Sequence, residues 1–193
     1  METRTLLLNA DYTPIRVLPW ERALIMQMEG TGFVVETYDE QIRSQRLSFH
    51  KPAVLALRKY KVPKGRIKFS SRNVLARDGH ICCYCGTRPR KENGVPDKEG
   101  LTMDHVIPRA KAQDNRVWLP WAKKWVNVTC WENAVCACKT CNSTKADRTP
   151  QEAGYSLSWL PRLPTPGDAV RISLAKMNSV PNEWKTYLPE EWR

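Results

Sequence analysis

Two pairs of cysteines restrict what this sequence can fold into more than any other feature. Cys82 and Cys85 lie in "CCYCG", and Cys138 and Cys141 lie in "CKTCN". Because two residues separate the thiols of each pair, one tight turn can aim both sulfurs at a single ion, and two such pairs complete a tetrahedral zinc site. The 52 residues between Cys85 and Cys138 exceed the length of a simple zinc ribbon. The sequence therefore predicts a four-cysteine zinc site with a substructure between its two halves.

The other three thiols are interpreted as buried side chains that behave as small hydrophobes. They are Cys83, Cys130 and Cys136. Three alternatives stay open. Cys83 and Cys136 would act as ligands in C-x-C pairs, or His80 would replace one sulfur, or the thiols would form a reduced cluster without metal. The total of seven cysteines is odd, which argues against a complete disulfide framework and for metal binding.

The charge balance favours an acidic partner. The 193 residues fit one domain, or one domain with a smaller companion, and include 31 lysines and arginines against 20 acids, a formal net charge of +11. Such an excess is typical of proteins that bind nucleic acid, and a basic protein without that role is the alternative. The opening residues do not read as a signal peptide, and no stretch approaches the length of a membrane span. We therefore expect a cytoplasmic protein with no membrane partner.

Composition divides the chain into three regions. Residues 1–60 predict a small N-terminal α+β region, and residues 61–154 hold a basic arm and the cysteine-rich core. Residues 155–193 are rich in proline and tryptophan, so we expect an irregular tail that packs on the body. Its expected packing anchors are Trp159, Trp184 and Trp192.

The N-terminal region shows strand and helix signals but no cluster of ligand-like residues. "RTLLLNADYTPIRVL" predicts two short strands around a turn at Asp11–Pro14. A helix is expected to begin at Pro19 and to end at Gly30, and "GFVVETY" predicts a further strand. These residues are interpreted as core and surface, not as a site.

The stretch 58–77 contains eight basic side chains and no acid. Tyr60, Phe69 and two turn-forming residues interleave the charges, which suits a strand or arm that follows a phosphate backbone. A solvated surface is the alternative interpretation. The residues of this stretch predicted to bind DNA are Lys64, Arg66, Lys68 and Arg72.

Between and around the cysteine pairs, the sequence resembles the HNH endonucleases, which are ββα-metal (His-Me finger) nucleases. The matching segments are "RDGHICCYCG", "LTMDHVIPR", "WENAVCACKTCNSTK" and "RTPQEAG", in that order, over residues 77–154. The start, "LNADYTPIRVLPWERAL", is similar to a region that accompanies this core in some bacterial and phage members. The resemblance implies an α+β fold with a central ββα-metal, treble-clef-like core that a four-cysteine zinc site holds together.

The resemblance also assigns roles to individual residues. Asp104 and Asn142 are expected to give oxygen ligands to one catalytic cation, Mg²⁺ or Mn²⁺. His105 is expected to act as the general base, and Asn133 to hold the catalytic loop in place. Asp104 and His105 are adjacent on an expected strand, so both can serve one phosphate only if the strand bulges or ends there.

Two further basic residues, Arg109 and Lys145, are interpreted as phosphate clamps, with plain surface charge as the alternative. The chain departs from compact HNH proteins at residues 111–130, an insertion rich in aromatic and basic side chains. It contains three tryptophans, Trp118, Trp121 and Trp125. One interpretation is a flap that touches DNA, and the other is a hairpin that buries its own tryptophans.

The combined expectation is a metal-dependent endonuclease with structural Zn²⁺ and catalytic Mg²⁺ or Mn²⁺. The resemblance implies hydrolysis of phosphodiester bonds in duplex DNA, leaving 5′-phosphate and 3′-hydroxyl ends, in a bacterium or a phage-infected host cell. The alternatives are a zinc-stapled nucleic-acid-binding module that does not cut and a phage assembly protein that uses the zinc fold as a scaffold. Asp104, His105 and Asn142 favour the enzyme, because a pure binding module needs no metal ligands and base.

Overall fold

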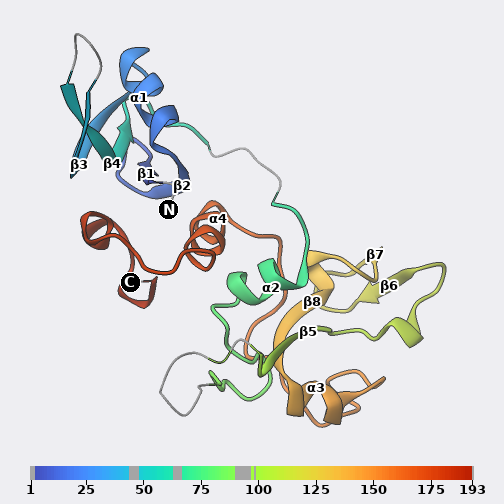
Figure 1. Cartoon of the computed structure of the whole chain (residues 1–193). Helices are drawn as coiled ribbons and strands as arrows, with labels where there is room; N and C mark the ends of the chain where they lie inside the picture. Colours follow the sequence, from blue (N-terminus) through green and yellow to red (C-terminus); the bar gives the residue numbers. More distant parts are fainter. Residues whose placement is uncertain (1–2, 44–47, 63–66, 90–96, 98, 193) are drawn as a thin grey trace. The chain divides into compact units, whose positions relative to one another are not determined.

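The protein forms two compact units along the chain (Figure 1). The structure is a computed structural model that describes residues 3–43, 48–62, 67–89, 97 and 99–192. Unit 1 comprises residues 1–66 and 165–193, and unit 2 comprises residues 67–164. Residues 165–193, the larger part of the expected tail, belong to unit 1 together with the N-terminal region.

Unit 1 is built on a four-stranded sheet with the strand order β2-β1-β4-β3. Its elements before the linker are β1 (Arg4–Leu8), β2 (Pro14–Pro19), α1 (Trp20–Met28), β3 (Gly32–Arg43) and β4 (Ser48–Leu57). Strands β1 and β4 are parallel, and the other neighbouring strands are antiparallel. The expected strand–turn–strand, helix and third strand are all present, and β4 is an element that the sequence interpretation did not include.

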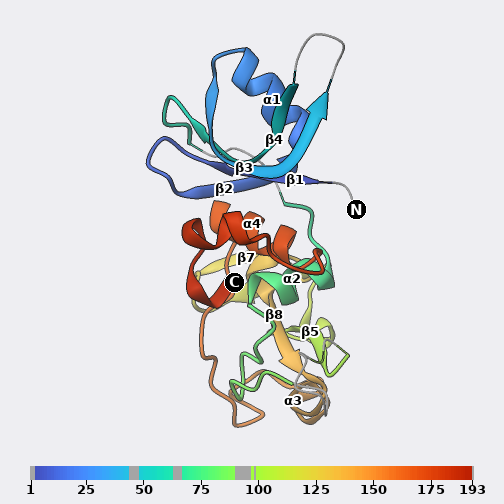
Figure 2. The ribbon, with the colours of Figure 1, turned by 60° about the vertical axis from the view of Figure 1, so that its left-hand side comes forward.

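Both faces of this sheet are covered by other elements of unit 1. Alternate residues of a strand point to opposite faces, so neighbouring residues pack against different elements. Leu6 and Val54 are fully buried against helix α4 (Pro166–Leu174) and the residues that follow it. Leu7 and Leu55 instead pack with Ala23 of α1 on the other face. Figure 2 shows α1 and α4 on opposite sides of the sheet.

The end of the chain is more regular than expected. Helix α4 begins with a capping box, in which Thr165 and Asp168 exchange side-chain and backbone hydrogen bonds. Trp184, in the 3-10 helix Asn182–Tyr187, is fully buried and donates from Nε1 to the carbonyl of Ala53 at 2.8 Å. The expectation of an irregular tail is thus wrong for residues 166–174, because a Pro-Gly pair at the start of a helix is compatible with helical geometry.

The described residues of unit 2 form two small sheets and two short helices. Its elements are α2 (Ser71–Arg77), β5 (Leu101–His105), η1 (Arg109–Lys111), β6 (Arg116–Leu119), β7 (Lys124–Asn127), η2 (Trp131–Asn133), β8 (Ala134–Cys138) and α3 (Lys139–Lys145). Strand β5 pairs with β8, and β6 pairs with β7, both antiparallel. Over its described residues the chain is a mixed α+β protein with small sheets and few helices. In the described part of the chain, no helix is both long and apolar enough to cross a bilayer.

A buried arginine joins three segments of unit 2. Arg77, the last residue of α2, donates to the carbonyl oxygens of Trp131, Arg162 and Ala134 at 2.7–2.9 Å. It also pairs with Asp78, whose carboxylate accepts from the backbone of β8. Arg77 was part of the basic stretch 58–77, but at 2% exposure it stabilises the fold and cannot follow a phosphate backbone.

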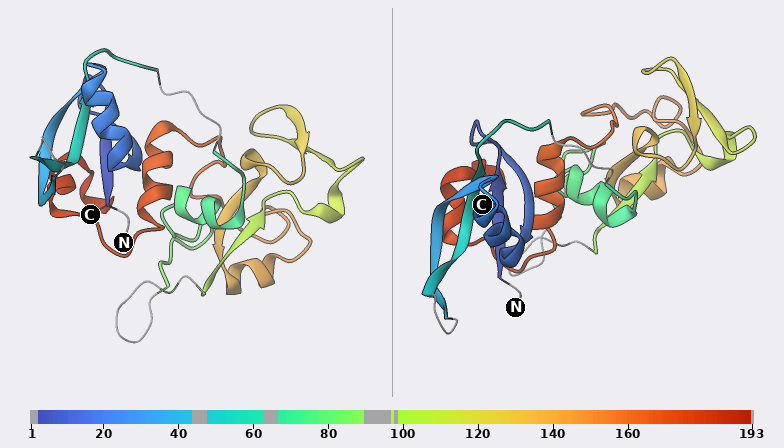
Figure 3. Two further views of the ribbon diagram at one scale, coloured as in Figure 1. Left: turned by 45° about the horizontal axis from the view of Figure 1, so that its top comes forward. Right: turned by 90° about the horizontal axis from the view of Figure 1, so that it is seen from above.

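The insertion at residues 111–130 folds into the β6–β7 hairpin, which extends from the β5–β8 pair (Figures 1 and 3). Its inner side chains, Val117 and Leu119, are buried. Trp118 and Trp125 are more than two-fifths exposed, so the hairpin does not bury all its tryptophans as one interpretation expected. Trp121 is half-buried against this inner cluster.

Candidate functional site

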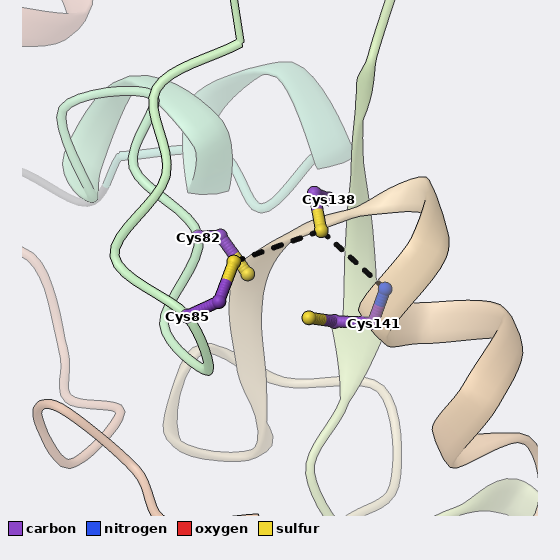
Figure 4. A group of neighbouring side chains, drawn as sticks. All are labelled: Cys82, Cys85, Cys138 and Cys141. Atoms are coloured by element: carbon purple, nitrogen blue, oxygen red, sulfur yellow. Dashed lines mark hydrogen bonds between the residues drawn. The ribbon is translucent and has the colours of Figure 1, made fainter.

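The four cysteines of the two C-x-x-C pairs converge in unit 2. Their sulfur atoms all lie within 4.8 Å of one another, and Sγ of Cys85 is 3.9 Å from Sγ of Cys138. Figure 4 shows that Cys82 and Cys85 come from one loop, whereas Cys138 and Cys141 come from the junction of β8 with α3. That loop turns tightly at Gly86, whose φ of 71° disfavours other residues.

This donor set fits a tetrahedral zinc ion. Zinc–sulfur bonds of about 2.3 Å place the sulfurs of a regular tetrahedron roughly 3.8 Å apart, close to the separation of Cys85 and Cys138. Burial raises the pKa of the Cys82 and Cys141 thiols. The Thr87 hydroxyl, which is 3.2 Å from Sγ of Cys85, lowers the pKa of that thiol to about 6. Only a bound cation allows all four groups to be thiolates together, because thiolates this close repel one another.

The other cysteines lie outside this cluster. Cys83 and Cys136 are fully buried, and Cys130 is half-buried. Burial raises the pKa of Cys83 to about 11, so its thiol stays protonated. Among the described residues, no further group of three or more cysteine, histidine or carboxylate side chains lies close enough to share an ion, and His80 is not in the four-cysteine group.

Asp104 is held in a buried ion pair next to the cluster. Its carboxylate is 7% exposed and accepts hydrogen bonds from Nζ of Lys145 at 3.1 and 3.2 Å. The same Nζ donates to the carbonyl of His105 at 2.9 Å. The Tyr84 hydroxyl also donates to Asp104, and burial raises the pKa of Tyr84, which keeps this donor protonated.

Both partners of Asp104 come from segments that carry cluster cysteines. Tyr84 immediately precedes Cys85, and Lys145 follows Cys141 by one helical turn of α3. Residues four apart on a helix share a face, so the helix that presents Cys141 to the cluster presents Lys145 to Asp104. A metal ion in the cluster would therefore also fix the groups that hold Asp104.

His105 is the last residue of β5 and is half-buried. Its Nε2 lies 3.1 Å from Oγ1 of Thr129. Burial lowers the pKa of His105, and the positive charge of Arg109 adds to that effect. The imidazole is therefore neutral at pH 7 and able to accept a proton. Asp104 and His105 were expected to serve one phosphate only if their strand bulges or ends there. Strand β5 pairs with β8 in an unbroken register up to His105, so the strand ends at this residue and does not bulge.

Asn133 joins the two chain segments beside His105. Its side chain is fully buried, and Oδ1 accepts from the backbone amide of Ile107 at 2.8 Å. Its Nδ2 donates to the carbonyls of Ile107 and Val128 at 3.0 and 2.8 Å. Ile107 lies two residues after His105, and Val128 precedes Thr129, so Asn133 connects the segment of the imidazole with that of its hydroxyl partner.

The residues fit a second, divalent cation only in part. Asp104 supplies a carboxylate, but the Lys145 ammonium already neutralises it and would repel a second cation. Asn142 is half-buried on α3, three residues before Lys145 and so on the same helix face. A cation shared by Asp104 and Asn142 remains a prediction.

The basic residues predicted to bind DNA differ in exposure. Lys68, Arg72 and Arg109 are exposed, as such a role requires. Lys64 and Arg66 lie outside the described residues. Lys145, interpreted as a phosphate clamp, is fully buried, and its amine already binds Asp104 and the carbonyl of His105. In this structure Lys145 therefore orients Asp104 and offers no surface to a phosphate.

Replacing Lys145 with methionine should lower the free energy of unfolding of unit 2 by about 3–5 kcal/mol, because it leaves the Asp104 carboxylate buried and unpaired. Urea denaturation followed by circular dichroism measures this change. Lys111→Met is the matched control, since Lys111 pairs with Glu152 at the exposed surface and its loss should have a much smaller effect. Equal effects of the two substitutions would contradict the structural role of Lys145.

Sequence and structure comparisons relate the chain to one family of nuclease-associated domains. Residues 5–64 match the family model of the HNH endonuclease-associated, N-terminal domain. No curated protein and no solved structure matches the chain. The matched residues lie in unit 1, whereas the cysteines, Asp104 and His105 lie in unit 2. The match thus links the chain to HNH nucleases through a domain that is not itself catalytic.

Two groups that contact the site could not be assigned from the sequence. Tyr84 lies between two cysteines, so its position was visible, but nothing indicated that its hydroxyl reaches Asp104, twenty residues along the chain. Thr129 precedes the "CWEN" segment and contacts His105 only because the insertion folds back on Ile107, in the segment that follows β5. Hydroxyl side chains carry no spacing signal of the kind that identified the cysteines.

Proposed function

We propose that the chain is an HNH-type, metal-dependent DNA endonuclease in which the four-cysteine cluster holds a structural zinc ion. The observation that carries the proposal is the neutral, half-exposed His105 at the end of β5, next to Asp104 and fixed to the cysteine cluster through Tyr84 and Lys145. The match of residues 5–64 to an HNH-associated domain supports the same class of protein. Duplex DNA is the proposed substrate, in keeping with the net charge of +11.

In the proposed reaction, His105 acts as the general base. With Nε2–H donating to Thr129, the lone pair of the ring is on Nδ1. Nδ1 takes a proton from a water molecule, whose oxygen forms a bond to phosphorus as the bond from phosphorus to the 3′ oxygen breaks. The leaving oxygen is protonated by solvent, and the products are a 5′-phosphate and a 3′-hydroxyl. Arg109 is exposed beside the imidazole and would contact the phosphate backbone.

Asp104 and Asn142 are the proposed ligands of the catalytic Mg²⁺ or Mn²⁺. When bound there, the cation supplies positive charge that stabilises the phosphate oxygens and the leaving oxygen. The chain contributes two hard oxygen donors, which suit these cations better than zinc. The Lys145 ammonium holds the carboxylate in place from the buried side.

A nucleic-acid-binding module that does not cut DNA is the second candidate. The observation that favours it is the pairing of Asp104 with Lys145, which satisfies the carboxylate without any cation. The cysteine cluster and the basic surface are expected of both candidates and do not distinguish them. Cleavage of DNA in the presence of added cation is expected of the endonuclease alone.

The cation requirement is the direct test of the proposed chemistry. After mild treatment with EDTA, the protein should nick or linearise supercoiled plasmid only when Mg²⁺ or Mn²⁺ is added back, while the zinc content stays at one ion per chain. Agarose gels and elemental analysis of the same sample measure both quantities. Cleavage that continues without any exchangeable cation would rule out the roles proposed for Asp104 and Asn142.

A further inference from the structure

The β6–β7 hairpin presents two tryptophans to solvent. Trp118 and Trp125 lie directly opposite each other across the strands and are 44% and 43% exposed. Their ring centroids are 6.1 Å apart, and the ring planes are inclined by 60°. Each indole therefore has free surface while it contacts the other. The neighbouring side chains Val117 and Leu119 point inward, so the hairpin keeps a core without the two indoles.

The hairpin surface is basic. Residues 109–127 contain five lysines and arginines and a single acid, Asp114. Lys111 and Lys124 pair with glutamates, whereas the others have no carboxylate partner in the described part of the chain. These others are Arg109, Arg116 and Lys123. Arg116 lies two residues before Trp118 on the same strand face, and its guanidinium donates to the carbonyl of Trp125.

The hairpin is fixed to the segments that position His105. Its inner residues pack with Ile107, which follows His105 by two residues, and with Val128, which precedes Thr129. The Asn133 side chain bonds to the backbone of Ile107 and Val128 at the same place. A strand of nucleic acid held on the hairpin would therefore lie at a defined position relative to the imidazole.

We infer that Trp118 and Trp125 stack on unpaired bases of a DNA strand and so direct the site to junctions between duplex and single-stranded DNA. An indole needs the free face of a base, which a base inside an intact duplex does not offer, because its neighbours cover both faces. The adjacent cations Arg116 and Lys123 suit the phosphates of the same strand. The inference rests on the proposed DNA substrate and specifies which form of DNA is bound.

The test compares two fluorescent probes: a blunt duplex, and the same duplex with a single-stranded tail. Binding is measured by anisotropy without added divalent cation, so no cleavage occurs. The variants Trp118→Thr and Trp125→Thr remove the indoles but keep a residue suited to strands. Trp118→Phe and Trp125→Phe keep an aromatic face. Leu160→Ala is the control, because Leu160 is an exposed apolar residue of the same unit, outside the hairpin.

The wild-type chain should prefer the tailed probe. Each threonine variant should bind it at least about fivefold more weakly, the effect of losing one stacked base, and should bind the blunt duplex as the wild type does. The phenylalanine variants and Leu160→Ala should keep most of the preference. Equal binding of the tailed probe by the wild type and both threonine variants would overturn the inference, as would an equal loss on both probes.

The result is independent of the proposed chemistry. A chain that cleaves plasmid but whose threonine variants show no loss specific to the tail contradicts only the role of the hairpin. A chain that never cleaves DNA but whose threonine variants show that loss contradicts only the proposed endonuclease activity. Melting temperature and zinc content, measured on each variant before binding, confirm that the hairpin alone has changed. If one threonine variant is unfolded, the threonine variant at the other position decides.

Discussion

A chain in which Cys141 is replaced by alanine should be isolated without zinc and without a cooperative unfolding transition for unit 2. Cys141 provides one of the four sulfurs and is the only cluster residue within the turns of α3, since Cys138 lies at its N-terminal cap. Structural zinc sites contribute roughly 10–16 kcal/mol of apparent binding energy, and that energy is folding energy. This energy is comparable to the total stability of a typical domain, about 5–15 kcal/mol.

The local structure explains why so much depends on one sulfur. Helix α3 has seven residues, well below the length at which a helix is stable alone. Without the metal, α3 loses the bonds that join Cys138 and Cys141 to the loop of Cys82 and Cys85, and Lys145 would be held less firmly against Asp104. Zinc stoichiometry and thermal unfolding measure the two consequences together.

The matched control is Cys136→Ala, which removes a buried thiol outside the cluster. That variant should keep one zinc ion per chain and lose on the order of 1 kcal/mol of stability. If Cys141→Ala unfolds like the control, and the wild type contains no zinc, the cluster is a group of reduced thiols and not a metal site.

Replacing His105 with alanine should reduce plasmid cleavage about 10²–10⁴-fold, the contribution of a positioned general base. The protein should stay folded, because the ring is half-exposed and its partner is the surface hydroxyl of Thr129. His50→Ala is the control: His50 is exposed on β4 of unit 1, and the chemical change is the same. Similar cleavage rates for the two variants would contradict the role of His105.

The cysteine cluster could be predicted from the sequence because ligand spacing is a local property. Two C-x-x-C pairs indicate one four-sulfur site wherever the intervening residues go, and the structure brings these four sulfurs together. The first helix and its flanking strands could also be predicted from the sequence, since Pro19 and Gly30 mark the ends of the helix.

The environment of Asp104 could not be predicted, because it depends on residues far apart in the chain. Lys145 lies 41 positions from Asp104, and a lysine is ordinarily exposed, so its burial follows only from the packing of α3 on β5. The same limitation applies to Arg77, which reads as part of a basic surface but binds three carbonyls in two segments far along the chain.

The start of helix α4 carries a sequence signal for a helix, but the composition of the surrounding segment suggested irregular structure. Thr165 and Asp168 have the spacing of a capping box, and Pro166 stands where a helix can begin, yet the prolines and tryptophans around them suggested an irregular segment. The orientation of Trp118 was hidden for a related reason. In a run of four residues with three apolar side chains, period-two alternation does not tell which side is buried.

The central claim, that this chain hydrolyses DNA through His105, is tested most directly by one comparison. Wild type and His105→Ala are purified side by side, adjusted to equal zinc content, and incubated with supercoiled plasmid and Mg²⁺ or Mn²⁺. The wild type should convert the plasmid to nicked or linear DNA with 5′-phosphate and 3′-hydroxyl ends, and His105→Ala should leave it supercoiled over the same time. Plasmid that stays supercoiled at wild-type concentrations that saturate DNA binding, or that is cut equally by both proteins, would contradict the claim.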